Sequence, residues 1–435
     1  MERKLYSRLL EWKNNTDNVK PLMVLGVRQA GKTYLISEFC KKEFKNYKII
    51  NLFDNSDVIN LYKSDLSSDE KYKRLKVLLN FDLDVDDSIL FIDEIQESEG
   101  LISELKYFCE KHNKVRIICA GSLLGVKLKR TKFPFPVGKV KMLTLYPMDF
   151  EEFLMALGEN LLISCIKDCY INNKKMDTVL HEKALNYYRI YLITGGMPES
   201  IDNMVKNNLD YIKYDNSILA DILTSYFNDM DKYVDNSAEA LKINRIYKSL
   251  PSQLMNLSNK FQFSIIDRNA RSREYSTSLD WLEACNMVLR CKCVTNPIVP
   301  LEGFVAEDTF KLYLSDIGIL NNVLKLNIND ILKDNLSLYK GVITENYVAN
   351  QLVCNGYDLY YWKSSNSAEI DFLLYTDDGI IPIEVKSGNR TQSKSLKYYI
   401  DTYKPKYSIR ISTKDFGYDP KTGIKSIPLY ALFML

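Results

Sequence analysis

The residues best suited to chemistry begin with a glycine-containing segment, PLMVLGVRQAGKT at positions 21–33. Gly26 to Thr33 fits the pattern G-x-x-x-x-G-K-[ST], in which glycines let several backbone N–H groups turn toward phosphate oxygens. We expect Lys32 to reach the terminal phosphates and the Thr33 hydroxyl to bind Mg²⁺. The sequence therefore predicts a site for ATP with Mg²⁺. The expected nucleotide contacts are Gly26, Val27, Arg28, Gln29, Ala30, Gly31, Lys32, Thr33 and Tyr34.

Two adjacent carboxylates end an apolar segment, SILFIDEIQ at positions 88–96. Its apolar run, residues 89–92, is typical of a central parallel strand that is buried on both faces. Asp93 follows this run and is expected to hold Mg²⁺. Glu94 is expected to polarise a water molecule for attack on the terminal phosphate. An ordinary capped strand end would explain the pair taken alone, but together with Lys32 the pair favours ATP hydrolysis over ATP binding alone.

Ser122 follows another predicted strand, in the segment KVRIICAGS at positions 114–122. Ser122 is a candidate sensor of the terminal phosphate, and the alternative is a serine that caps the next turn.

The elements that must position these residues alternate along the chain. We expect strands at 21–25, 89–92 and 114–120, with helices at about 32–40 and at 102–111. This alternation predicts a parallel sheet with helices on both faces.

A second set of carboxylates occurs in the last hundred residues. Glu345 lies in a helical stretch, GVITENYVANQLVCNGY, with Val342 and Ala349 as its neighbours on the helix surface. Burying an isolated charge is costly, so a metal ion or a cation is expected to pair with Glu345. Asp371 lies in the strand-like AEIDFLLY. Glu384 and Lys386 share one face of GIIPIEVKSG.

This arrangement of a helical acid, Asp371 and Glu384-x-Lys386 resembles the PD-(D/E)XK nuclease core. The resemblance implies that Glu345, Asp371 and Glu384 bind one or two Mg²⁺ ions, and that Lys386 assists the attacking water or neutralises charge in the transition state. A strand hairpin with surface charges is the alternative, and Glu345 on an apolar face argues against it. Three later residues could contact the substrate backbone: Gln392, Lys394 and Tyr398.

Five motifs occur in the order GVRQAGKT, LFIDEIQ, ICAGS, LTLYPMDFEEFL and GGMPES. Together they resemble a bacterial and archaeal family of AAA-type ATPases whose carboxy-terminal domain has no known function. The resemblance implies an α/β fold with a P-loop NTPase core of parallel strands (1–148), a helical and winged-helix middle domain (149–335) and a restriction-endonuclease-like α/β domain (336–435). Similar proteins have a Gly-Arg pair where this chain has Gly138-Lys139. If that arginine acts as a finger on a neighbouring nucleotide, Lys139 would replace it poorly, because lysine lacks the planar guanidinium fork.

The predicted middle domain leaves its partner open. Helices followed by short strands fit a winged helix, which binds DNA or serves as a spacer or protein contact. Two basic windows could contact phosphates, and solvated loops are the alternative. They contain Lys127, Lys129, Arg130, Lys132, Lys139 and Lys141 in one window, and Arg268, Arg271 and Arg273 in the other.

Composition limits the class of protein. The 435 residues are 46% hydrophobic and 26% charged, with a formal net charge of +2, which neither requires nor excludes a nucleic-acid partner. Nine cysteines and two histidines lack the spacing of a zinc site. No apolar run reaches the roughly 20 residues of a membrane-spanning helix, and the start has no apolar signal-peptide core. We therefore expect a cytoplasmic protein without a membrane partner.

Two functions remain in competition. In the first, the protein hydrolyses ATP with Mg²⁺ and acts on DNA through a nuclease-like domain. In the second, it is an ATP-driven switch or remodeller whose inert nuclease-like domain grips nucleic acid or a protein. A small-molecule kinase is less favoured, because Asp93-Glu94 suits water activation and no acceptor pocket is evident. An oligomer is compatible with either function.

Overall fold

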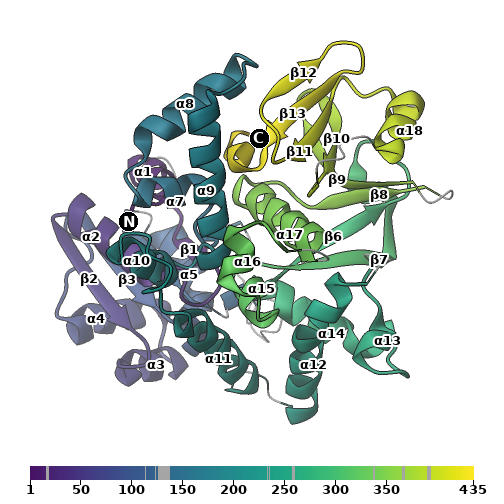
Figure 1. Cartoon of the computed structure of the whole chain (residues 1–435). Coiled ribbons are helices and arrows are strands. Elements are labelled where there is room, and N and C mark those ends of the chain that lie inside the picture. Colours follow the sequence, from purple (N-terminus) through teal and green to yellow (C-terminus); the bar gives the residue numbers. More distant parts are fainter. Residues whose placement is uncertain are drawn as a thin grey trace. The chain divides into compact units, whose positions relative to one another are not determined.

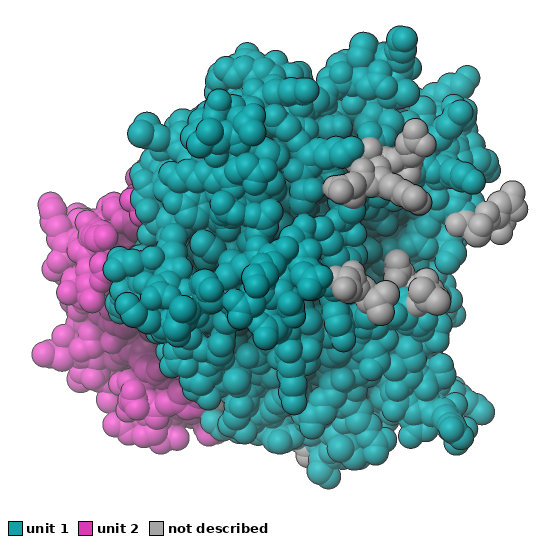
Figure 2. Space-filling view, viewed as in Figure 1, with its two compact units in different colours: residues 1, 147–283, 287–435 teal, residues 2–146, 284–286 magenta. Residues whose placement is uncertain are grey.

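The computed structural model describes residues 1–15, 19–112, 114–122, 124–125, 138–232, 234, 236–256, 260–336, 339–364, 368–388 and 393–435 (Figure 1). The chain divides into two units, coloured separately in Figure 2. The amino-terminal unit contains Glu2–Tyr146 and Ala284–Asn286. The carboxy-terminal unit contains Met1, Pro147–Glu283 and Met287–Leu435.

The amino-terminal unit is built on a five-stranded sheet in the order β2-β3-β4-β1-β5, in which every neighbouring pair is parallel. Its strands are β1 (Leu22–Leu25), β2 (Asn46–Asn51), β3 (Ser88–Asp93), β4 (Arg116–Ala120) and β5 (Lys141–Thr144). Its helices are α1 (Leu5–Asn14), α2 (Lys32–Glu43), α3 (Ser56–Lys63), α4 (Ser68–Leu79), η1 (Ile95–Glu97) and α5 (Glu99–Lys111). The predicted parallel α/β fold of this unit is confirmed.

Apolar side chains cover both faces of this sheet. Leu90 and Ile92 pack in one core with residues of α3, α4 and α5. Ile89 and Phe91 pack in another core with residues of α1 and α2. All six residues of β3 are buried, which confirms the predicted central strand. The alternation of side chains along β3 therefore supplies both cores at once.

Three predicted boundaries in the amino-terminal unit need correction. The helix expected to end near residue 40 continues to Glu43. The helix expected from residue 102 begins at Glu99, because the Ser98 side chain accepts the Leu101 N–H at 3.3 Å and caps the helix earlier. The strand expected from residue 114 begins at Arg116.

The carboxy-terminal unit begins with helices and ends with a mixed sheet. Its helices are α7 (Phe150–Ala156), α8 (Asn160–Ile171), α9 (Thr178–Thr194), α10 (Pro198–Lys206), α11 (Ser217–Lys232), α12 (Ser237–Leu254), α13 (Phe263–Ile266), α14 (Ser272–Ala284), η2 (Leu301–Phe304), α15 (Ile317–Val323), α16 (Ile328–Leu332), α17 (Tyr339–Cys354), α18 (Lys394–Tyr403) and η3 (Leu429–Met434). Within the described residues, none of these helices, or of those in the other unit, has the length and apolar character needed to cross a bilayer.

The mixed sheet has eight strands in the order β12-β13-β11-β10-β9-β8-β6-β7. They are β6 (Val288–Val294), β7 (Val305–Leu314), β8 (Tyr360–Lys363), β9 (Glu369–Thr376), β10 (Gly379–Val385), β11 (Ser408–Ser412), β12 (Gly417–Asp419) and β13 (Ile424–Pro428). β6 and β7 come from the predicted winged-helix region, yet β6 pairs with β8. The predicted boundary between residues 335 and 336 therefore falls inside one unit, and the division there stays a prediction.

The GGMPES motif is held by a buried carboxylate from a later segment of the chain. Asp316, 2% exposed, accepts the Gly196 N–H at 2.7 Å and the Ile319 N–H at 2.9 Å. Gly195 ends α9 with a φ of 61° and a ψ of −159°, a conformation that is essentially limited to glycine. A Cβ at Gly195 would lie 2.2 Å from Asp316 Oδ1. The GGMPES segment is thus held by the strand-to-helix turn at Asp316.

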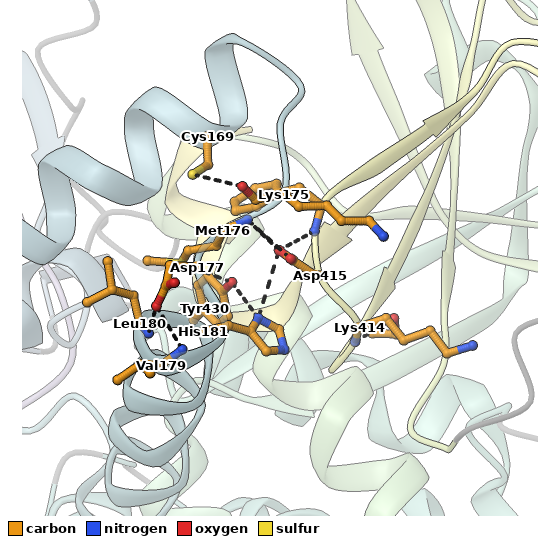
Figure 3. A network of polar contacts seen from close by, with 12 residues as sticks. Cys169, Lys175, Met176, Asp177, Val179, Leu180, His181, Lys414, Asp415 and Tyr430 are labelled. Carbon is orange, nitrogen blue, oxygen red and sulfur yellow. Dashed lines mark hydrogen bonds and ion pairs between the residues drawn. The ribbon is translucent and has the colours of Figure 1, made fainter.

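A second polar network connects the start of α9 to the end of the chain (Figure 3). Asp415 accepts the Met176 N–H at 3.1 Å, and His181 Nδ1 lies 2.8 Å from the Tyr430 hydroxyl. The Tyr430 hydroxyl also lies 3.4 Å from Met176 Sδ. Segments about 250 residues apart are therefore fixed side by side within the carboxy-terminal unit.

Candidate functional site

The phosphate loop of the amino-terminal unit connects β1 to α2. Gly26 and Gly31 have φ angles of 141° and 90°, which other residues rarely adopt. A Cβ at Gly26 would lie 2.1 Å from the Leu145 carbonyl oxygen, because the chain after β5 passes directly beside the loop. Both glycines are therefore required by the path of the backbone. Among the predicted nucleotide contacts, Arg28, Gln29, Thr33 and Tyr34 are exposed, whereas Gly26, Val27, Ala30 and Lys32 are buried.

Lys32 and Thr33 begin α2 from the end of this loop. The Lys32 ammonium donates to the carbonyl oxygens of Gly26 and Val27 at 2.8 and 2.9 Å, so it lies within the curl of the loop. The Thr33 hydroxyl donates to Asp93 Oδ2 at 2.7 Å. The structure thus brings Lys32 and Thr33 close to Asp93, which lies 60 residues after Thr33 in the chain.

Asp93 and Glu94 lie at the carboxyl end of β3. Asp93 is 4% exposed, and burial raises the pKa of its carboxyl group, an effect that the nearby Glu94 charge reinforces and the Thr33 hydroxyl opposes. Glu94 has a φ of 55°, and its N–H donates to Asp93 Oδ1 at 3.1 Å. The side-chain amide of Gln96 donates to Glu94 Oε2. A bound cation would offset the cost of the buried Asp93 charge.

Ser122 follows β4, which lies between β1 and β3 in the sheet. Since the carboxyl ends of parallel strands meet at one edge of the sheet, Ser122 lies on the same edge as the phosphate loop and Asp93. Gly121 precedes it, and a Cβ there would lie 2.0 Å from Gln96 Oε1. Gln96 is 2% exposed and therefore fills the space between Glu94 and the end of β4.

Two residues at this site were missed by sequence reasoning. Gln96 stands in the quoted DEIQ motif, so its spacing from Glu94 was the available signal. No pattern in the sequence pointed to Arg3. Its guanidinium donates to the Ala30 carbonyl at 2.7 Å and to the Tyr146 carbonyl at 2.6 Å. Arg3 thereby ties the phosphate loop to the segment after β5.

The residues around the loop fit ATP and Mg²⁺. The left-handed glycines form the backbone cradle that phosphate needs. The paired Thr33 hydroxyl and Asp93 carboxylate are oxygen ligands of the kind that Mg²⁺ prefers. The roles assigned to the individual residues stay predictions.

The second predicted site lies in the carboxy-terminal unit. Asp371 Oδ2 accepts the Val385 N–H at 2.7 Å. Glu384, on the neighbouring strand, is 4% exposed, and its Oε1 contacts the Lys386 ammonium. Its Oε2 is buried and has no hydrogen-bond partner among the described residues. Burial raises the pKa of Asp371 well above its usual value, and the charges of Glu345 and Glu384 raise it further. An orphaned carboxylate oxygen beside a second acid fits a divalent cation.

Glu345, on α17, has the partner that its apolar surroundings led us to expect. That partner is an ammonium group: Lys311 Nζ lies 2.8 Å from Glu345 Oε1, and the Tyr313 hydroxyl donates to the same oxygen at 2.5 Å. Sequence reasoning missed Lys311 because it lies in a strand of the predicted middle domain. Among the described residues, no three carboxylate, histidine or cysteine side chains are arranged as a ready metal site. The three-carboxylate metal site therefore stays a prediction.

The remaining candidates are dispersed. Lys394 begins α18, and Tyr398 on that helix stacks on Trp362 with ring centroids 6.1 Å apart. Lys139 pairs with Glu110 at 3.0 Å, Lys141 begins β5, and Arg268, Arg271 and Arg273 are exposed. The other predicted contacts lie outside the described residues: Lys127, Lys129, Arg130, Lys132 and Gln392.

Three segments of the chain match known families. Residues 18–154 match an AAA domain, residues 185–330 match a domain of unknown function (DUF8612), and residues 340–432 match another domain of unknown function (DUF4143). The chain is also 25% identical over 409 residues to an uncharacterized protein of Methanocaldococcus jannaschii, MJ1544, which covers 91% of this chain and 81% of that relative.

The solved structures with partial likeness to this chain include the following two. One is the Walker-type ATPase paby2304 of Pyrococcus abyssi, with a TM-score of 0.41, 14% identity and coverage of 74% of this chain and 95% of that chain. Another is the Aeropyrum pernix ORC2 protein in ADPNP–ADP complexes, with a TM-score of 0.35, 13% identity and coverage of 78% and 90%. Both scores are too low to indicate a shared overall fold.

The AAA match covers the phosphate loop, Asp93, Glu94 and Ser122. Residues 18–154 are therefore similar to an AAA-type ATPase domain, which supports that part of the predicted fold. The predicted winged helix and nuclease-like domain are not confirmed, because the families matched over those regions have no known function.

Proposed function

We propose that the amino-terminal unit binds ATP with Mg²⁺ and hydrolyses it. The main support is the 2.7 Å contact between Thr33 Oγ1 and Asp93 Oδ2, which joins the loop to the acidic strand end. Lys32 would leave the Gly26 and Val27 carbonyls to bind the terminal phosphates, and the loop N–H groups would bind the remaining phosphate oxygens. When bound, Mg²⁺ would neutralise charge on the β- and γ-phosphates.

Glu94 is the candidate general base. Its carboxylate would accept a proton from the attacking water, and the Gln96 amide would hold that carboxylate in position. Ser122 would contact the terminal phosphate from the end of β4. The loop and its surroundings thus supply binding, orientation and a proton acceptor.

Two substitutions separate binding from hydrolysis. Lys32→Ala should weaken ATP binding by roughly 100-fold, since it removes charged hydrogen bonds to the phosphates. Glu94→Gln should bind ATP normally but lower kcat by roughly 100-fold or more. Fluorescent-ATP titration and phosphate release measure the two effects. Unchanged affinity in Lys32→Ala would exclude the loop assignment, and normal turnover in Glu94→Gln would exclude the base.

For the carboxy-terminal unit, we propose metal-dependent action on DNA. The supporting observation is the buried Oε2 of Glu384 near Asp371, an oxygen to which no described residue hydrogen-bonds. Asp371 and Glu384 would hold a divalent cation, and Lys386 would orient the attacking water or neutralise charge at the scissile phosphate. The cation would supply Lewis-acid activation.

A cleavage assay tests this second function. DNA of several forms is incubated with Mn²⁺ or Mg²⁺, with and without ATP. Wild type should cleave, Glu384→Ala should not, and Glu307→Ala, at an exposed strand position of the same unit, should cleave normally. DNA or protein binding without cleavage by wild type would favour an ATP-driven switch or remodeller with an inert domain. Cleavage that persists in Glu384→Ala would place the activity elsewhere.

A further inference from the structure

Four carboxylates of the carboxy-terminal unit, Glu345, Glu369, Asp371 and Glu384, form an acidic cluster, and Lys311 is a buried cation within it. The residue is 2% exposed. Its Nζ lies 2.8 Å from Glu345 Oε1 and 2.8 Å from Glu369 Oε1, so one ammonium bridges two carboxylates. The ammonium also lies 4.8 Å from the centre of the Tyr361 ring. A cation held between two carboxylates occupies the kind of position that a metal ion takes in a two-carboxylate site.

The three partners come from different elements of the carboxy-terminal unit. Lys311 lies on β7, Glu345 on α17 and Glu369 on β9. β6 and β8 separate β7 from β9 in the sheet, so the sheet must curve to bring Lys311 to Glu369. α17 also contacts both β7 and β10. The bridge is therefore a product of the folded sheet and helix and has no local sequence pattern.

Glu345 and Glu369 are largely satisfied by neighbouring groups. Glu345 Oε1 accepts from Lys311 and from the Tyr313 hydroxyl. Glu369 contacts Lys311 through Oε1 and Lys363 through Oε2, the latter at 3.5 Å. In contrast, Glu384 Oε2 is buried, and no group in the described part of the chain hydrogen-bonds to it. The free capacity for a cation lies at Asp371 and Glu384.

We propose that Lys311 is a fixed cation of this cluster, so that the site takes one divalent ion at Asp371 and Glu384 and excludes a second ion at Glu345 and Glu369. This inference rests on the metal site proposed above. A protonated lysine has no lone pair and cannot be a ligand. A divalent ion at Glu345 would also meet the repulsion of the ammonium at short range in a poorly solvated site. Glu345 is accordingly a positioning residue and no metal ligand.

Mn²⁺ binding to the nucleotide-free full chain tests the proposal. Electron paramagnetic resonance counts bound Mn²⁺, and the relevant ions are those lost when Asp371→Asn and Glu345→Gln are combined in one protein. Wild type should bind one such ion. Lys311→Met should bind two, because removal of the ammonium leaves two partly buried carboxylates that favour a cation. The matched control is Lys363→Met, which removes an exposed ammonium from the same Glu369 and should leave the count at one.

The outcomes distinguish this inference from the proposed function. Two such ions in wild type, or only one in folded Lys311→Met, would overturn the role of Lys311 but keep the metal site. No Asp371-dependent ion in wild type would overturn the metal site itself. If circular dichroism shows that Lys311→Met does not fold, Glu345→Gln decides: a retained ion supports the proposal, and a lost ion makes Glu345 a ligand and overturns it.

Discussion

Single residues in this protein are held by backbone groups far away in the chain. Arg3 binds the Ala30 carbonyl of the phosphate loop, and Asp316 binds the Gly196 N–H, 120 residues before it. Both side chains are almost fully buried. Buried charges of this kind are costly unless every polar atom is paired, so they fix the local geometry strongly.

Asp316 makes stability depend on pH. Burial raises the pKa of its carboxyl group from 3.8 to about 6 in the folded protein, although three backbone N–H groups oppose the shift. Between these values the folded state binds more protons than the unfolded state, so this contribution to stability falls as pH rises. Wild type should gain about 1 kcal/mol from Asp316 on going from about pH 7 to about pH 5.

Asp316→Asn provides the comparison for this prediction. Asparagine does not titrate in this range and still offers one acceptor oxygen, so its stability curve should lack the Asp316 contribution. Urea unfolding of both proteins at several pH values gives the difference. Parallel curves for wild type and Asp316→Asn would contradict the raised pKa.

At the scale of elements, helices and strands are joined by polar contacts between remote segments. The start of α9 is fixed to the segment around η3 by Asp415, His181 and Tyr430 (Figure 3). Tyr430 is fully buried, and its hydroxyl lies next to both His181 and Met176. The contact between α9 and η3 thus combines apolar packing with a hydrogen bond.

Tyr430→Phe should lower the free energy of unfolding by about 1 kcal/mol. The ring and its packing remain, but His181 Nδ1 loses its hydroxyl partner in a half-buried place. Chemical denaturation measures the change. Tyr418→Phe, at a site that is 53% exposed, is the control and should have no measurable effect. Equal stability of Tyr430→Phe and wild type would show that the network does not stabilise this junction.

At the scale of the whole molecule, the two units have separate sheets and separate cores. The carboxy-terminal sheet recruits β6 and β7 from sequence well before α17. The carboxy-terminal family match, residues 340–432, therefore covers only part of a folded unit.

Fragments test where the carboxy-terminal unit begins. A fragment of residues 147–435 should unfold cooperatively, because it contains every strand of the eight-stranded sheet. A fragment of residues 336–435 should not, because it exposes the edge of β8 and leaves Glu345 and Glu369 without Lys311. Calorimetry and amide exchange distinguish the two. Cooperative unfolding of the shorter fragment would show that the boundary at 335/336 is a real domain boundary.

The sequence alone determined the phosphate loop, the central strand that ends at Asp93 and the parallel α/β fold around them. These features follow from contiguous residues: glycine spacing, an unbroken apolar run and the alternation of strands with helices. It also indicated that Glu345 needed a partner, because a carboxylate on an apolar helix face cannot stay unpaired.

Only the tertiary structure decided which partner that is. Lys311, Arg3 and Asp316 act on residues between 27 and 143 positions away, and nothing in the neighbouring sequence specifies such a contact. The pairing of β6 with β8, and of β7 with β6 at the edge of the sheet, could not be predicted for the same reason. Strand pairing depends on edges that form only when distant segments meet, and a strand pattern does not name its neighbour.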